Sequence, residues 1–317
     1  MELRQTRAQQ PRVEWRDESP STNAELRELA AEADRAGAPL PHGTVLLTDN
    51  QTAGRGRLTR GWEVLPGRAL AVSVLVRGYG HRDGDGAAGG GAAAGGAAAG
   101  VGAAVGPAAA AWGDLGPGWL PFIAGAAVNA AFQPLFTAAA ARDETEAMRV
   151  GMKWPNDIHV RDEEDAVAGR TGKKLCGILC ELLPDGSAII GMGMNLLTPE
   201  WELPTERATS LLAAGADVGG AESFADPLGA ELADRVVAAV TAEISRLAEL
   251  AAREPEAIRI RAARHSLTLG SEVRVHLPGD EIVDGRARAL ADDGALIVDL
   301  PTGGTLAVNA GDVQHLR

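Results

Sequence analysis

The stretch that decides the fold is residues 174–196, which read KLCGILCELLPDGSAIIGMGMNL. Two apolar runs lie on either side of Pro184, Asp185 and Gly186, residue types that tight turns favour. Because each run is long enough for a strand, the pattern predicts an antiparallel hairpin. Segments 150–154 and 158–160 predict two more strands around a turn at 155–157. The four strands together form an antiparallel meander.

Upstream and downstream of this meander, strands and helices alternate. A helix is expected to begin between Ser21 and Asn23, because Thr22 and Glu25 have the spacing of a capping box. Other expected strands are 13–16, 44–47 and 69–76, and other expected helices are 119–136 (amphipathic), 228–250 and 254–263. This mixture indicates an α+β catalytic domain over residues 1–264.

The last part of the chain has a different character. Short strands separated by glycine-rich turns are expected at 273–277, 282–290, 295–300 and 305–308. Such spacing suits a small barrel, so we expect a second domain at 265–317. Its acidic balance makes it a poor nucleic-acid binder and favours a docking or stabilising role.

Composition excludes several classes of protein. The 317 residues carry 30 Lys and Arg against 43 Asp and Glu, a net charge of −13. A chain this acidic does not bind nucleic acid or anionic membrane over its whole surface. The 2 cysteines, Cys176 and Cys180, are too few for a disulfide framework or a structural zinc site, and we interpret them as reduced core thiols.

The chain shows no targeting segment, and we expect it to be cytoplasmic. A glycine- and alanine-rich stretch at about 80–118 reads as a flexible insertion without chemistry. The uncharged run from Gly86 to Ala111 within it is long enough to span a bilayer, but it lacks the Leu, Ile and Phe content that drives insertion.

The first segment that could carry chemistry is a loop at 51–57, QTAGRGR, which extends to Arg60 and Trp62. Glycines let a backbone approach a ligand closely, and arginines hold carboxylate or phosphate oxygens in a bidentate fork. A loop of this kind could close over an anionic substrate. Taken alone, the segment is also typical of a solvated basic turn or an RNA-contacting segment.

The second segment is 153–157, KWPND. A lysine at the end of a strand can project into a pocket and stabilise an oxyanion or an α-phosphate. Asn156 could orient a substrate, and Asp157 could hold a metal or fix the turn. All three lysines of the chain lie at 153–174, which hints that a compact amine is needed there, although chance clustering or a surface lysine before a proline turn remain alternatives.

The third segment is the glycine pair Gly191 and Gly193, with Gly177 in the neighbouring expected strand. Glycines inside an apolar strand mark a bulge or a place where a ligand lies against the backbone, while close strand packing is the ordinary explanation of a single one. The sequence contains no dinucleotide fingerprint, phosphate-loop motif or Gly-x-Ser-x-Gly elbow.

In this order, the motifs at 21–23, 51–62, 153–157, 174–178 and 191–195 resemble those of the biotin protein ligases, and the resemblance covers nearly the whole chain. It implies that biotin and MgATP give biotinyl-5′-AMP and pyrophosphate. The biotinyl group then passes to a lysine of the biotin carboxyl carrier domain of an acyl-CoA carboxylase. The implied fold is a mixed-sheet α+β domain with flanking helices, related to class II aminoacyl-tRNA synthetases, followed by an SH3-like barrel.

The resemblance also implies residue roles. Lys153 and Arg57 would be catalytic, and Asp157 is a candidate for Mg²⁺. Biotin would be bound by Ser21, Thr22, Asn23, Gln51, Arg55, Gly56, Arg57, Lys153 and Gly177. ATP and the adenylate would be bound by Arg55, Arg57, Arg60, Trp62, Asn156 and Asn195. The biotin carboxylate attacks the α-phosphorus itself, so the protein supplies charge and alignment rather than a nucleophile.

The chain departs from the family pattern in places. Leu58 and Thr59 replace polar or basic and glycine residues of the loop, and Trp201 is only a weak match for an aromatic that stacks on adenine. Twenty residues before Ser21 are too few for a helix-turn-helix domain, so we expect a ligase without repressor function and without nucleic-acid or membrane partners. A lipoate ligase is a related alternative, and a non-enzymatic RNA-binding protein is disfavoured by the net charge.

Overall fold

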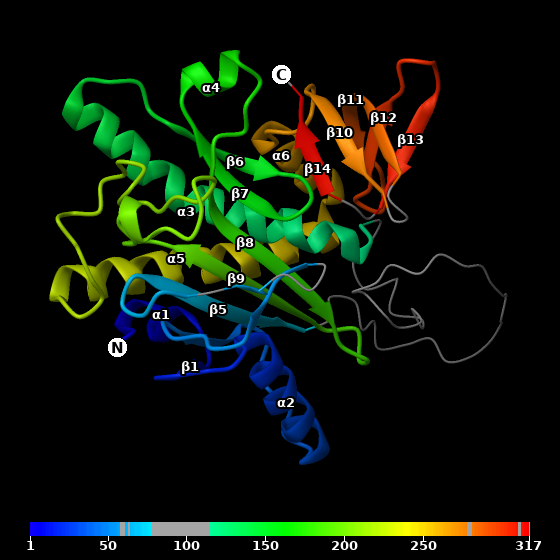
Figure 1. Ribbon diagram of the computed structural model, residues 1–317. Coiled ribbons are helices and arrows are strands. Elements are labelled where there is room, and N and C mark those ends of the chain that lie inside the picture. Colours follow the sequence, from blue (N-terminus) through cyan, green and yellow to red (C-terminus); the bar gives the residue numbers. More distant parts are fainter. Residues whose placement is uncertain (58–60, 63, 78–114, 278–280, 310–311, 317) are drawn as a thin grey trace, which may run out of the picture.

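The computed structural model describes residues 1–57, 61–62, 64–77, 115–277, 281–309 and 312–316 (Figure 1). Most of the expected insertion at 80–118 lies outside these residues, as does the uncharged run at 86–111. The loop residues Leu58, Thr59 and Arg60 also lie outside them.

A seven-stranded mixed sheet forms the centre of the larger part of the fold. Its strands in spatial order are β1 (Val13–Trp15), β2 (Thr44–Thr48), β5 (Ala69–Val76), β9 (Ala188–Asn195), β8 (Lys173–Leu182), β7 (Asp157–Arg161) and β6 (Arg149–Lys153). Strands β1 and β2 are parallel, and every other neighbouring pair is antiparallel. The predicted meander is therefore confirmed as β6 to β9.

Helices cover the two faces of this sheet unequally (Figure 1). On one face, α3 (Leu120–Asp143) packs on β6 to β9 and α5 (Pro227–Arg253) packs on β5, so that alternate residues of β5 such as Val72 and Val74 lie in the main core. The opposite face packs Leu75 against Leu26 of α2 (Thr22–Arg35). Two further helices, α1 (Arg4–Gln9) and α6 (Pro255–His265), contact α5. Because one short helix covers the second face, part of that face is left for a cavity.

Helix α3 differs from the expected amphipathic helix at 119–136. It follows a 3-10 turn, η3 (Pro117–Trp119), and all residues from Phe122 to Asn129 are buried. The sheet, α5 and α6 enclose this helix, so it has no solvent-facing polar stripe there. By length and composition, Pro117–Asp143 could cross a membrane, but 61% of its most apolar window is buried inside the fold, as in a core helix.

Helix α2 begins where expected but with a different cap. Ser21 is the N-cap residue, and its Oγ accepts a hydrogen bond from the backbone N–H of Ala24 at 3.4 Å. Glu25 does not complete the expected capping box, since its carboxylate pairs with Arg16 at 3.2 Å. The cap shifts by one residue because Thr22 turns its hydroxyl toward the interior instead.

The C-terminal part is a five-stranded antiparallel sheet. Its spatial order is β13 (Thr305–Val308), β12 (Leu296–Asp299), β11 (Ile282–Leu290), β10 (Glu272–His276) and β14 (Asp312–His315). Strand β14 was not expected from the sequence. The α+β class with a small all-β C-terminal unit is confirmed.

Both cysteines lie on β8, four residues apart and therefore on one face of the strand. Cys176 is buried and Cys180 is half-buried, and neither forms a disulfide. Burial raises the pKa of both thiols, which makes them inert as nucleophiles. The interpretation as core thiols is confirmed.

Candidate active site

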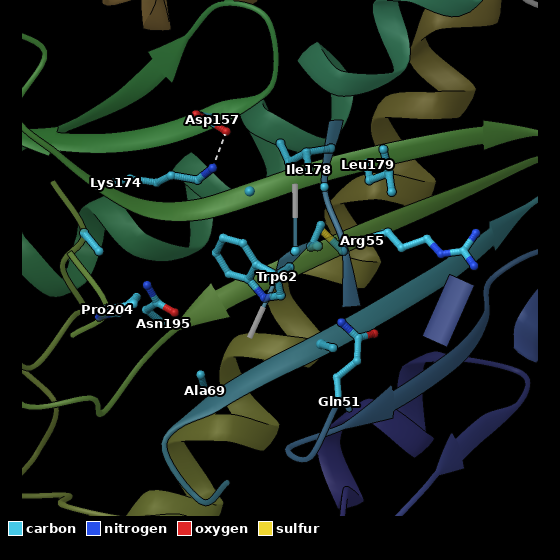
Figure 2. Close-up of a pocket in the computed structure, with 18 of the residues that line it drawn as sticks. Gln51, Arg55, Trp62, Ala69, Asp157, Lys174, Ile178, Leu179, Asn195 and Pro204 are labelled. Carbon is cyan, nitrogen blue, oxygen red and sulfur yellow. Dashed lines mark ion pairs between the residues drawn. The ribbon is translucent and has the colours of Figure 1, made fainter. Parts of the chain in front are cut away.

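A cavity of about 650 Å³ opens on the less covered face of the central sheet (Figure 2). Its lining contains every predicted site residue that the structure describes: Ser21, Thr22, Asn23, Gln51, Arg55, Gly56, Arg57, Trp62, Lys153, Asn156, Asp157, Gly177 and Asn195. Arg60 lies outside the described residues. Segments separated by more than 170 residues are thus brought to one cavity.

The strand register explains the floor of the cavity. Directly paired residues on neighbouring strands point to the same face of a sheet. One such row runs across the sheet from Ala71 to Gly193, Gly177, Asp157 and Lys153. The row therefore has small residues in its middle and opposite charges at its edge.

A hydrogen-bonded polar cluster closes the end of the cavity near α2. The side-chain oxygen of Gln51 accepts from the Thr22 backbone N–H at 3.0 Å. The hydroxyl of Ser73, which is fully buried, lies 2.7 Å from Thr22 Oγ1 and 2.6 Å from Asn23 Oδ1. Buried polar atoms satisfied in this way hold their side chains in one geometry.

Asn23 has its amide already engaged by the protein. Its Nδ2 donates to Leu179 O at 3.1 Å and to Glu181 Oε1 at 2.9 Å. A Cβ on Gly191 would overlap this amide, which explains the glycine. Asn23 therefore fixes the start of α2 against β8 and β9. Its Nδ2 and Oδ1 atoms are already hydrogen-bonded within the protein.

Two lysines and one carboxylate form the opposite end of the cavity. Lys174 Nζ lies 2.7 Å from Asp157 Oδ1 (Figure 2). Lys153 is the register partner of Asp157 across the β6–β7 turn. Sequence reasoning gave Lys174 no site role, although the clustering of lysines was a signal. The ion pair between Lys174 and Asp157 could not be read from the sequence, because the two residues are not register partners on β7 and β8.

A buried histidine lies beside these charges, two residues after Asp157 on the same face of β7. His159 is 7% exposed, and its Nδ1 lies 3.2 Å from Gly172 O. Burial is the main cause that lowers the pKa of His159 to about 4, and the positive charges of Lys153 and Lys174 add to it. The imidazole is neutral at physiological pH, so it does not serve as a cationic partner of a phosphate.

Trp62 lies over the glycine floor (Figure 2). It belongs to a small hairpin in which β3 (Gly54–Arg55) pairs with β4 (Gly61–Trp62). A Cβ on Gly193 would overlap its indole ring, and a Cβ on Gly177 would lie 3.2 Å from it. Lys174 Nζ lies 5.3 Å from the ring centroid, within cation–π range. The Trp62 Nε1 is buried and has no hydrogen-bond acceptor among the residues described.

The two predicted asparagines support the backbone around the cavity. Asn156 Nδ2 donates to Ile178 O at 2.6 Å, and Ile178 N donates back to Asn156 O at 2.9 Å. Asn195 Nδ2 donates to Thr209 O at 3.0 Å. Asn156 thus ties the turn after Lys153 to β8, and Asn195 ties the end of β9 to Thr209, which directly follows the cavity-lining residue Ala208.

The rim contains residues that the sequence did not reveal. Glu202, Leu203 and Pro204 line the cavity next to the 3-10 turn η4 (Glu200–Glu202). Trp201 in the same turn is 84% exposed and is not part of the lining, so the structure does not bring it to the cavity. Among the described residues, no group of three or more His, Cys, Asp or Glu could hold a metal ion.

Comparisons with known proteins agree with this geometry. Residues 268–316 match the family model described as "Biotin protein ligase C terminal domain". A biotin–[acetyl-CoA-carboxylase] ligase of Mycobacterium tuberculosis (strain ATCC 25618 / H37Rv) is 34% identical over 297 residues, which are 94% of this chain and 86% of that protein. The bifunctional ligase/repressor BirA of Bacillus subtilis (strain 168) is 26% identical over 178 residues, which are 54% of this chain and 39% of that protein.

Solved structures share the fold. The biotin protein ligase from Aquifex aeolicus in complex with biotin and ATP has a TM-score of 0.59 and 22% identity, and the match covers 97% of this chain and 99% of that chain. The biotin protein ligase from Leishmania major in complex with biotinyl-5-AMP has a TM-score of 0.50 and 23% identity, over 95% and 99% of the two chains.

Proposed function

Because the chain belongs to the biotin protein ligase family, we propose that the cavity described above binds biotin and ATP side by side. The chain is an ATP-dependent ligase that activates biotin as biotinyl-5′-AMP and transfers it to a lysine of a biotin carboxyl carrier protein domain. The observation that carries the proposed site is that five separate motifs line one cavity.

We assign the biotin head group to the polar end of the cavity. Ser21, Thr22 and Gln51 present hydroxyl and amide groups there. Such groups can donate hydrogen bonds to the carbonyl oxygen of a cyclic urea and accept them from its N–H groups. Asn23 supports this end through its bonds to β8 rather than through a free amide. The small residues Gly177 and Gly193 leave the space between the two ends to the indole of Trp62, along which the apolar part of the substrate would lie.

We assign the carboxylate and the phosphates to the charged end. Lys153 and Arg57 would stabilise negative charge as the carboxylate attacks the α-phosphorus and pyrophosphate leaves. Arg55 and Gly56 would contribute from the same loop, and Arg60 remains a prediction. Trp62 with Asn195 and Asn156 would border the nucleotide. A cavity that excludes water protects the mixed anhydride until the acceptor amine arrives.

Magnesium is assigned to the nucleotide rather than to a protein cage. Mg²⁺ commonly binds one or two carboxylates together with substrate phosphates, and it would neutralise phosphate charge in the displacement. Asp157 and Glu202 are carboxylates in the lining, and Asp157 already neutralises Lys174. Asp157 remains the candidate ligand. To bind Mg²⁺, its carboxylate would have to give up the ion pair with Lys174.

The acceptor is the carrier domain of an acyl-CoA carboxylase. We propose that the reaction takes place in the cytoplasm, without a nucleic-acid or membrane partner, since the net charge of −13 opposes both. The small C-terminal unit at 265–317 is proposed as a separate domain whose boundary follows α6.

Biotin-dependent exchange of labelled pyrophosphate into ATP tests the first step. We expect exchange with biotin and none with lipoate or octanoate. Lys153→Ala should lower the exchange rate about 100- to 1000-fold, the usual effect of removing a group that stabilises transition-state charge. Lys173→Ala is the matched control, because Lys173 is exposed, pairs with Glu200 and lies outside the cavity lining. Exchange with lipoate alone, or with none of the acids, would reject the proposal.

A further inference from the structure

The strand that carries Lys153 is bonded on its outer side to the start of the C-terminal unit. Strand β6 is the edge of the seven-stranded sheet. Leu267 N donates to Met152 O at 2.8 Å, and Trp154 N donates to Thr268 Oγ1 at 3.0 Å. Lys153 therefore lies between two residues whose backbone groups are held by segment 266–268.

The indole of Trp154 makes a second bond to the C-terminal sheet. Trp154 is 3% exposed, and its Nε1 donates to Gly294 O at 3.3 Å. Two residues away, Asp292 O accepts from Trp119 Nε1 at 2.9 Å. The turn between β11 and β12 thus binds one tryptophan beside the cavity and one at the start of α3.

Thr268 is fully buried and also meets β14. Its Oγ1 lies 3.3 Å from His315 Nε2. Burial is the main cause that lowers the pKa of His315 to about 4, so the imidazole is neutral near pH 7. In the tautomer with an unprotonated Nε2, the Thr268 hydroxyl donates to His315 while its oxygen accepts from Trp154 N. The hydroxyl then uses its one proton and one of its two lone pairs.

Resting on the proposed function, we infer that Thr268 is a positioning residue for the adenylation step. Through Trp154 it fixes the backbone that aims Lys153 at the reacting carboxylate and α-phosphate. The Trp154–Gly294 bond keeps the turn between β6 and β7 from rotating about the Trp154–Thr268 bond. On this inference the C-terminal sheet is a part of the catalytic apparatus and does more than add stability.

The test compares Thr268→Val, which removes the hydroxyl at nearly constant volume, with Thr268→Ser, which keeps it. The measurements are the single-turnover rate of biotinyl-5′-AMP formation at saturating biotin and MgATP, the Kd for biotin by calorimetry, and the Tm. We expect the valine variant to lose about 10- to 100-fold in rate, since small displacements of a catalytic group are costly. The Kd for biotin should change by about threefold or less, because the polar end is untouched, and serine should restore the rate.

Thr241→Val is the matched control. Thr241 is fully buried on α5, outside the cavity lining, and its hydroxyl donates to Ala238 O at 3.3 Å. It should keep the wild-type rate whatever it does to Tm. A wild-type rate in Thr268→Val would overturn the inference, as would an equal loss of rate in Thr241→Val at equal loss of Tm.

If Thr268→Val does not fold, Thr268→Ala replaces it. This variant also removes the hydroxyl oxygen that accepts from Trp154 N, and it introduces no branched side chain in its place. The same selective loss of rate is expected, and a wild-type rate would overturn the inference. Failure of the proposed function would look different, because the wild-type protein itself would then form no adenylate from biotin.

Discussion

At the scale of single residues, Gly193 lacks a side chain because the indole of Trp62 occupies the space above it. Gly193→Ala should displace the indole and with it the β3–β4 hairpin. If Trp62 borders the nucleotide, the KM for ATP should rise about tenfold, which corresponds to about 1.4 kcal/mol. Steady-state exchange kinetics at varied ATP would measure this change.

Gly61→Ala is the matched control for this substitution. Gly61 lies in the same hairpin, and apart from its own chain neighbours no atom of the described residues lies within 4 Å of a Cβ placed there. Its KM for ATP should stay close to that of the wild type. An unchanged KM for ATP in Gly193→Ala would show that the position of the Trp62 indole does not affect nucleotide binding.

At the scale of secondary-structure elements, α1 is fastened to α5 by one buried carboxylate. Asp234 is 4% exposed and accepts from Gln5 N at 2.8 Å, Thr6 N at 2.9 Å and Thr6 Oγ1 at 2.7 Å. Asp234→Ala leaves these donors without a partner, so we expect the free energy of unfolding to fall by about 3 kcal/mol. Urea denaturation would measure the loss.

Glu231→Ala on the same helix serves as the comparison, because Glu231 is exposed. Its effect should stay within about 0.5 kcal/mol, as for ordinary surface positions. Equal effects of the two substitutions would show that the bonds to α1 add nothing. Since no residue of either helix lines the cavity, neither variant should change the KM for biotin.

Elements with a strong local pattern could be predicted, and contacts set by register could not. The turn residues at 184–186 and the apolar runs beside them predicted β8 and β9 to within one residue. Ser73 lies in an apolar strand, and nothing in the sequence marks it as the support of Thr22 and Asn23. The prediction of an amphipathic helix at 119–136 missed the burial of α3, although the lack of a clear polar stripe in its Ala-rich sequence is the pattern of an enclosed helix.

The candidate site was predictable at the level of motifs. The chain order of the motifs indicated which residues meet, and the cavity contains those that the structure describes. The partners of these residues were not predictable, because the Lys174–Asp157 ion pair and the Thr268–Trp154 hydrogen bond depend on the tertiary positions of the side chains. Hydrogen-bond partners of this kind follow from tertiary structure rather than from local pattern.

At the scale of the whole molecule, stability should depend on pH through His159. The usual pKa of 6.5 applies to the unfolded chain, and the pKa in the fold is about 4. Between these values the unfolded state binds more protons, so the free energy of unfolding is full above about pH 6.5 and falls as the pH drops toward 4. For so buried a group the loss is about 3 kcal/mol.

Urea denaturation at pH 7.5, 6 and 5 would check this dependence. His159→Gln removes the titrating ring, so its unfolding free energy should fall less steeply over the same range. Equal slopes in the wild type and the variant would assign the dependence to other groups. His315, whose pKa is also lowered to about 4, should leave part of the slope in the variant.

The turn between β11 and β12 also limits how this protein can be recombined with its relatives. Its carbonyl groups at Asp292 and Gly294 meet two indoles that belong to segments far away in the chain. A chimera that exchanged the small sheet for that of another ligase would need this turn at the same length and with the same backbone path. If these contacts position Lys153 as we infer, a hybrid of unmatched halves would fold and still form adenylate slowly.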